Sequence, residues 1–376
     1  MDYINIVEYK TENDSLVGGD VFIDYNNNGP YDSLFKTLKS YAFYGDLPEK
    51  YILNITTPHI VKDEIDLNIN PKVLKDLQKG NAKILINRIG EFDSFNNGSL
   101  HGLLYPNLFK QLDELNIDKS NVLYMNFNSA VNQSCHKEKI NIRYHNFTQM
   151  NLYSIIKNKE SEYRELFERE KKSLKEYYYL CYNNNPKPHR KEIVDLLLSN
   201  KVKGLLSSTS DGIFLDDAKP LTEIVEWPVQ NANLYYYANQ EHFKNSYFSI
   251  ITESHFSDDV NSLNLTFTEK TWKPITNFHP FCMVGAKNSL SKLREYGFET
   301  FPELFDEGYD ASVDGEKRMN DITKGLKRTF LLSIDELSNI YYSMEEKLVH
   351  NFHHFFRLCE NETKELEKYL LKFCNS

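Results

Sequence analysis

The stretch from Ser246 to Gly285 constrains the fold more than any other part of the chain. A short apolar run, Phe248 to Ile251, ends in polar residues, and a polar loop then leads to a helix start near Thr268. A second apolar run stops at Gly285. This order is typical of a β-loop-α-β unit, which places two parallel strands in one sheet. It therefore predicts an α/β protein with a parallel sheet.

Further short apolar runs predict more strands. They lie at 50–55, 82–87, 121–126, 177–182, 202–206 and 224–227. Segments with helical patterns separate them, and the clearest lie at 31–44, 74–77, 104–115 and 191–198. Strands alternating with helices indicate parallel sheets covered on both faces. The first residues, from Met1 to about Asp20, predict irregular structure.

Two helical regions divide the chain. Asn151 to Lys175 is highly charged, and Glu160 precedes Arg164 by the four residues that place opposite charges side by side on a helix. We interpret it as a solvated connection and place a boundary there, giving domains at 1–160 and 161–345. Amphipathic segments from Ile334 to Asn351 and from Asn361 to Phe373 predict helices, the last of which, within 346–376, is expected to pack back on the domains.

Composition narrows the class of protein. The chain has 376 residues, enough for two domains with sizeable cores, and its net charge of −10 argues against a surface that binds nucleic acid everywhere. Its five cysteines lack any CxxC spacing, so they predict neither a disulfide framework nor a zinc site. No apolar run approaches a membrane span, and Met1 is not followed by a basic leader. We expect a cytoplasmic protein.

The helix start near Thr268 carries the first candidate site. Thr268 is a suitable N-cap, and free N–H groups of the first turn are expected to attract an anion. Lys270 adds a mobile positive charge for a phosphate, whereas Glu269 suits a ribose diol. Glu253, at the end of the preceding strand, either faces the nucleotide or is structural. The same residues also fit ordinary helix capping with a solvated charge pair.

These segments resemble a known donor-binding signature. Phe248-Ser-Ile-Ile-Thr-Glu-Ser254, then Phe267-Thr-Glu-Lys270, then His279-Pro-Phe-Cys-Met-Val-Gly285 resembles the pattern of α1,3-fucosyltransferases and related GT-B glycosyltransferases. The chain departs from it by a longer gap and by lacking the Asn between Glu253 and Ser254. Residues 269–274 with the segments around Phe301 and Asp310 also look like uncharacterised glycosyltransferase-like proteins of phages and large viruses. The location would then be the host cytoplasm.

The resemblance implies a fold and an activity. It implies two facing Rossmann-like domains of GT-B type, with 1–160 on the acceptor side, 161–345 binding the nucleotide-sugar donor, and C-terminal helices. The expected function is an enzyme that transfers a sugar from a nucleotide sugar to a hydroxyl acceptor. No metal and no cofactor beyond this co-substrate are expected.

A second candidate site lies at 183–190. The strand expected at 177–182 runs into a polar loop with prolines that begins at Asn183, and a helix begins near His189. Arg190 in the first turn then lies at the carboxyl edge of the sheet, and its guanidinium matches diphosphate oxygens. The fucosyltransferase layout, a strand ending in Ser-Asn and then an Arg, implies donor contacts for Asn183 and Arg190. The alternative is a surface arginine, and His189 either contacts phosphate or caps the helix.

Candidates for the catalytic base follow the strand at 82–87. An inverting transferase needs a carboxylate or histidine against the acceptor hydroxyl. Glu91 and Asp93 are the first candidates and His101 the third, although a polar loop with solvated acids explains them equally well. Glu91-x-Asp93 also suggests a metal-dependent GT-A fold, in which the acids hold Mg²⁺ or Mn²⁺. That alternative leaves the Arg190 and Glu269 segments unexplained.

The acceptor stays open between a glycan and a hydroxymethylated base in phage DNA. The DNA option predicts a basic channel with salt-dependent binding. Its candidate residues are Lys137, Lys139, Arg143, Lys187, Arg190 and Lys191. A non-catalytic protein that binds nucleotides or nucleic acid on the same fold is the alternative of a different class.

Overall fold

The chain is an α/β protein whose strands form two parallel sheets. The structure is a computed structural model. It describes residues 3–8, 34–35, 38–41, 46–57, 69–88, 106–126, 141–169, 173–183, 187–208, 223–224, 238–256 and 265–376. Two compact units contain one sheet each. The first comprises 1–155, 261–266 and 359–376, and the second comprises 156–260 and 267–358.

The first unit contains a six-stranded sheet in the order β2-β1-β3-β4-β5-β6. Its strands are β1 (Ile4–Glu8), β2 (Leu38–Tyr41), β3 (Tyr51–Thr57), β4 (Ala82–Arg88), β5 (Val122–Asn126) and β6 (Asn141–Tyr144). Every pairing is parallel. Helices α1 (Pro71–Lys79) and α2 (Pro106–Glu114) connect the later strands, with the short 3-10 helix η2 (Lys119–Asn121) before β5. The apolar residues of β3 and β4 form the core with Val73 and Leu77 of α1.

Two predictions for this half are wrong. The residues before Asp20 contain β1, an interior strand, and β2 lies where a helix was expected at 31–44. Ile4, Ile6 and Val7 are fully buried because β1 lies between two other strands. The ladder between β1 and β2 joins segments far apart in the sequence, so local pattern carries no signal for it.

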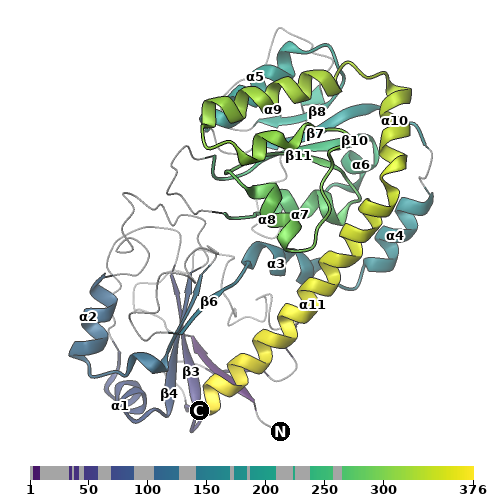
Figure 1. The fold of residues 1–376 in the computed structure, drawn as a ribbon. Coiled ribbons are helices and arrows are strands. Elements are labelled where there is room, and N and C mark those ends of the chain that lie inside the picture. The colour runs from purple at the N-terminus through teal and green to yellow at the C-terminus, as the bar shows by residue number, and fades with distance from the viewer. Residues whose placement is uncertain are drawn as a thin grey trace. The chain divides into compact units, whose positions relative to one another are not determined.

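The second unit contains a five-stranded sheet in the order β11-β10-β7-β8-β9. Its strands are β7 (Tyr177–Asn183), β8 (Leu205–Ser208), β9 (Glu223–Ile224), β10 (Ser246–Thr252) and β11 (Phe281–Val284). All pairings are parallel, and every residue of β10 is buried. Figure 1 shows α5 (Pro188–Ser199) and α9 (Gly315–Thr329) on one face of this sheet. The other face carries α6 (Gln240–Lys244), α7 (Glu269–Thr276) and α8 (Ser289–Glu295).

The remaining helices differ in their bounds from the predicted ones. They are α3 (Phe147–Ile156), α4 (Glu160–Arg169), the 3-10 helix η6 (Glu307–Ala311), α10 (Ile334–Ser343) and α11 (Glu345–Asn375). The charged stretch predicted as one helix is thus two, α3 and α4. A capping box at Ser333 and Glu336 starts α10, and the chain passes directly into α11 after Met344. The C-terminal helix expected within 346–376 is the last part of α11.

Helix α11 belongs to both units. Its residues up to Leu358 count with the second unit and those from Cys359 with the first. Within the first unit, Lys50 Nζ donates to the carbonyl oxygen of Asn375 at 2.8 Å, and a cation there suits the negative end of a helix. The domains expected at 1–160 and 161–345 are continuous in sequence, whereas the observed units are not. Among the described helices, none is both long and apolar enough to cross a membrane.

Candidate functional site

The second sheet reverses its strand order between β7 and β10. From β7 the chain passes through α5 to β8, and from β10 it passes through α7 to β11 on the opposite side. Such a reversal leaves a crevice outside the carboxyl ends of the two adjacent strands, where open α/β sheets bind ligands. The two predicted donor segments follow these strands, so the fold brings them to the same edge.

Asn183 lies at this edge, and protein groups already engage its side chain. Its Oδ1 accepts from Thr252 Oγ1 at 2.5 Å, and its Nδ2 donates to Cys181 Sγ at 3.3 Å. Its backbone nitrogen donates to Ser207 Oγ at 3.1 Å. The residue therefore joins the ends of β7, β8 and β10. A donor contact by Asn183 stays a prediction.

The start of α5 is tied to the end of β10. Pro188 occupies the first helical turn, where a missing N–H has no cost. Lys187 Nζ donates to the carbonyl oxygen of Ser254, and His189 Nε2 donates to that of Glu253 at 2.9 Å. Burial lowers the pKa of His189 to about 4, and nearby positive charges add to the effect of burial. His189 is therefore neutral near pH 7 and acts here as a structural donor.

Arg190 follows directly and is buried, not exposed as a surface arginine would be. Only 4% of it is accessible to solvent. Its guanidinium acts on two neighbours. Burial raises the pKa of the Cys181 thiol and the charge of Arg190 opposes that rise, while at His189 the same charge adds to the lowering caused by burial. A permanently charged group thus lies against the end of β7, at the edge where the sheet reverses.

The start of α7 differs from the expectation in one respect. Thr268 is the N-cap, as predicted, and its Oγ1 accepts from the backbone nitrogen of Lys270 at 3.4 Å. The backbone nitrogen of Thr268 donates to Glu253 Oε1 at 3.0 Å, and that of Thr271 to the Thr268 carbonyl at 3.1 Å. Protein oxygens thus accept from the backbone N–H groups of Thr268, Lys270 and Thr271, so these three are not free for an external anion as expected. An anion site at this turn stays a prediction.

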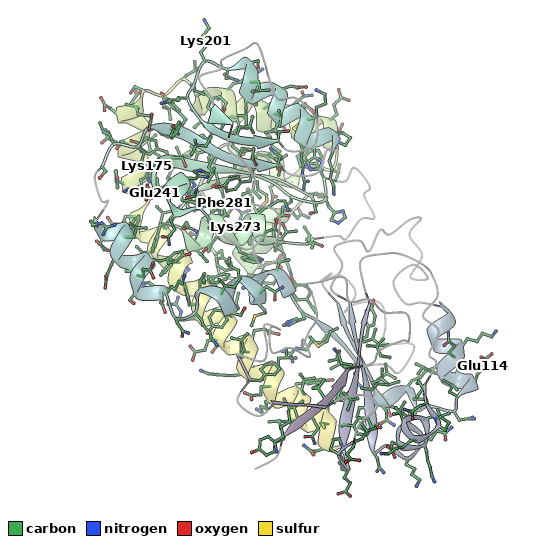
Figure 2. The ribbon with its side chains drawn as sticks, turned by 180° about the vertical axis from the view of Figure 1, so that it is seen from behind. Glu114, Lys175, Lys201, Glu241, Lys273 and Phe281 are labelled. Atoms are coloured by element: carbon green, nitrogen blue, oxygen red, sulfur yellow. The ribbon has the colours of Figure 1, made fainter. Side chains whose placement is uncertain are left out.

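Glu269, Lys270 and Lys273 form a charged group on α7, in which Glu269 and Lys273 are buried and Lys270 is half-buried. Lys270 Nζ lies 2.8 Å from Glu269 Oε1 and 3.2 Å from Thr268 Oγ1. Burial alone would raise the pKa of Glu269, but the charges of Lys270 and Lys273 outweigh it and the pKa is lowered. Burial lowers the pKa of Lys273 to about 8, against the opposing effect of Glu269. Lys273 is buried, and Figure 2 labels it within the second unit.

The cavity beside this group is too small for a nucleotide. It measures about 20 Å³, which is room for one water molecule, and lies between α7 and the strands β7 and β10. Lys270 and Lys273 line it together with Leu180, Ile250 and Pro274. A ligand of this site would therefore lie outside the strand ends rather than beneath α7.

A larger pocket of about 460 Å³ lies elsewhere in the second unit. Residues of the 302–307 segment, α9 and α10 line it, and none of the predicted site residues does. Its charged groups are paired within the protein: Arg328 lies 3.6 Å from Asp306, and Glu307 accepts from Arg294 and Thr300. We therefore assign the candidate site to the strand ends and not to this pocket.

The sequence did not indicate two residues that lie near the site, Phe256 and Arg318. Phe256 stacks on His189, with ring centroids 5.4 Å apart, and the guanidinium carbon of Arg318 lies 4.4 Å from the same ring centroid. Arg318 is 1% exposed, and its Nη1 donates to the carbonyl oxygen of Ser312 at 2.8 Å. Phe256 lies three residues after Glu253, and this short spacing is a signal that could have placed it near the site. Nothing in the sequence near Arg318 indicates that α9 packs against the segment that contains Phe256.

Several predicted residues fall outside the residues that the structure describes. These are Glu91, Asp93, His101, Lys137 and Lys139. Of the other residues predicted for a basic channel, Arg143 Nη2 pairs with Glu362 at 2.9 Å in the first unit. Lys191 pairs with Asp195 at 2.7 Å in the second. The catalytic base and the channel stay predictions.

No metal centre is evident in the described part of the chain, since no three of its His, Cys, Asp or Glu side chains are grouped as ligands would be. The candidate site offers electrostatic interactions, from guanidinium and ammonium groups and a carboxylate at one edge of the sheet.

Comparison with models of known protein families gave no match, and comparison with curated proteins gave no significant match.

Proposed function

We propose that this protein is a glycosyltransferase of GT-B type that binds a nucleotide-sugar donor at the carboxyl edge of the second sheet. The observation that supports this most is the strand reversal between β7 and β10. The two helices that begin there carry Arg190 on one side and Glu269 with Lys270 on the other. The first unit, with its own parallel sheet, would supply the acceptor side.

The charges at this edge suit a nucleoside diphosphate. A guanidinium forms paired hydrogen bonds with phosphate oxygens, so Arg190 would bind the diphosphate, with Lys270 as a second cation. Glu269 is kept ionised by its lysine neighbours and would accept hydrogen bonds from the ribose hydroxyls. These cations would also stabilise the negative charge that develops on the leaving diphosphate, which makes transfer without a metal the simplest proposal.

In the transfer step, the bond between the anomeric carbon and the diphosphate oxygen breaks and a bond to the acceptor oxygen forms. The acceptor proton passes to a general base, and Glu91, Asp93 or His101 is the predicted base after β4. The nucleoside diphosphate leaves with both bonding electrons. A glycan and a hydroxymethylated DNA base are the two acceptors proposed.

Thermal stabilisation by a panel of nucleoside diphosphates and nucleotide sugars tests the donor site. We expect nucleotides that carry one particular nucleobase to raise the melting temperature of the wild type. Arg190→Ala or Glu269→Ala should abolish this shift. Lys191→Ala is the matched control, because Lys191 lies next to Arg190 on α5 but is exposed and paired with Asp195. No shift with any nucleotide would contradict the proposal.

Hydrolysis of the nucleotide sugar separates an enzyme from a binding protein. We expect slow release of the nucleoside diphosphate without acceptor and faster release once the correct acceptor is added. Binding without any release, with either acceptor class, would support the non-catalytic alternative. If modified DNA, and no glycan, accelerates release of the nucleoside diphosphate, and if salt weakens this effect, the acceptor is nucleic acid.

A further inference from the structure

Glu253 is the most completely engaged carboxylate at the candidate site. Its Oε1 accepts from the backbone nitrogen of Thr268 at 3.0 Å and from Thr271 Oγ1 at 2.5 Å. Its Oε2 accepts from Thr268 Oγ1 at 2.7 Å and from the backbone nitrogen of Ser254 at 3.2 Å. Four protein donors thus surround a side chain that is only 2% exposed.

The backbone of Glu253 joins the same point to two other elements. Its nitrogen donates to the carbonyl oxygen of Val284 at 2.9 Å, which extends the ladder between β10 and β11. Its carbonyl oxygen accepts from His189 Nε2 at 2.9 Å, at the start of α5. One residue therefore contacts the first turns of both helices that carry the predicted ligand-binding groups.

We infer that Glu253 is a positioning residue, which holds the first turn of α7 so that Glu269 and Lys270 face the ligand, and does not itself contact the ligand. The inference rests on the proposed function for its ligand. A ribose hydroxyl that bound Glu253 would have to displace buried protein donors, and each displacement leaves a buried group without its hydrogen bond. Glu253 also places a negative charge where the α7 dipole is positive, so phosphate recognition falls to side-chain cations.

An amide cannot replace this carboxylate. Glutamine offers one acceptor oxygen, and its NH₂ group would face at least one of the two backbone nitrogens, of Ser254 or of Thr268, that donate to Glu253. The first turn of α7 would then shift. Every ligand that depends on Glu269 and Lys270 should bind more weakly, irrespective of its ribose hydroxyls.

The test compares dissociation constants for the best-bound ribonucleoside diphosphate and for its 2′-deoxy and 3′-deoxy forms. We expect Glu253→Gln to weaken all three alike, by about tenfold. Glu269→Gln should instead remove the preference for the ribose form. The inference is overturned if Glu253→Gln erases that preference while deoxy forms bind as before, or if it leaves all three affinities unchanged.

Two threonines of α7 supply a second variant and a control. Thr271→Val removes one donor to Glu253 at nearly constant shape, and it should weaken binding of the three ligands alike. When it is combined with Glu253→Gln, it should add less than about twofold to the loss of affinity caused by Glu253→Gln alone. Thr276→Val removes a buried hydroxyl that donates to Trp272 and Lys273 carbonyls at the other end of the helix. It should lower stability and leave affinity unchanged. Equal affinity losses for both threonine variants would contradict positioning through Glu253.

Failure of the proposed function gives a different result. If the wild type binds no nucleotide, hydrogen exchange of the backbone amides at 268–271 still tests the inference. Glu253→Gln should speed their exchange, and Thr276→Val should not. Unchanged exchange in Glu253→Gln would overturn the inference independently of any ligand.

Discussion

Thr252 Oγ1 lies 2.5 Å from Asn183 Oδ1, so the last residues of β10 and β7 are joined at the point where the second sheet reverses its order. Both side chains are buried. When a buried acceptor loses its donor, the folded state becomes less stable, because no water molecule replaces the lost hydrogen bond. The hydrogen bond therefore holds the two strand ends together at the candidate site.

Thr252→Val should lower the free energy of unfolding by about 1–3 kcal/mol, because the amide oxygen of Asn183 stays buried without this donor. Chemical denaturation measures the change. Ser343→Ala, which removes an exposed hydroxyl bonded to the Ile340 carbonyl, is the control and should cost much less. A loss no larger than that of the control would contradict this role for Thr252.

The protein should lose stability as the pH falls from 6.5 to 4, in part through His189. Burial places the pKa of folded His189 at about 4, below its ordinary value of 6.5. Between these values the unfolded chain binds a proton that the folded chain does not, so stability rises with pH across this window. The contribution amounts to about 3 kcal/mol at most.

His189→Gln tests this dependence, since glutamine does not titrate but still offers an N–H to the Glu253 carbonyl. The free energy of unfolding should change less steeply between pH 4 and pH 6.5 in the variant than in the wild type. Denaturation curves at several pH values give both slopes. Equal slopes would show that His189 does not titrate as described.

Arg190→Lys should weaken binding of a nucleoside diphosphate by about tenfold or more, although the charge is kept. An ammonium is a point charge and cannot form the paired hydrogen bonds of a guanidinium. Calorimetric titration of the variant against the wild type measures the loss. Full affinity in Arg190→Lys would mean that Arg190 does not contact phosphate.

Nucleotide affinity should fall as the pH rises through 8. Lys273 loses its proton in this range because burial lowers its pKa to about 8, and the site then loses one positive charge. Lys273→Met removes the titrating group and should bind with little change across the same range. A fall of equal size in Lys273→Met would assign the effect to another group.

The general fold could be read from the sequence where apolar runs are bounded by turn residues. The runs that predicted strands at 50–55, 82–87 and 177–182 correspond to β3, β4 and β7. The helix start at Thr268 was equally clear, because a local N-cap determines it. The pairing of β2 with β1 had no local signal, and the expected helix at 31–44 was wrong for that reason.

The candidate site was only half visible in the sequence. Arg190, Glu269 and Lys270 stood out because charged residues follow apolar runs. The partners of Glu253 lie in the next helix, and Arg318 reaches Phe256 from a helix much later in the chain. Such contacts arise from tertiary packing, so residue type and spacing could not distinguish a ligand-facing acid from one enclosed by protein donors.

Helix α11 has a consequence for how the protein is made. The first unit includes residues 359–376, and two of its contacts join them to earlier segments: Lys50, just before β3, with Asn375, and Arg143 of β6 with Glu362. During synthesis on the ribosome, all residues of the second unit are therefore made before the residues that complete the first unit. The sheet of the first unit must wait, with part of its surface uncovered, until residues 359–376 emerge.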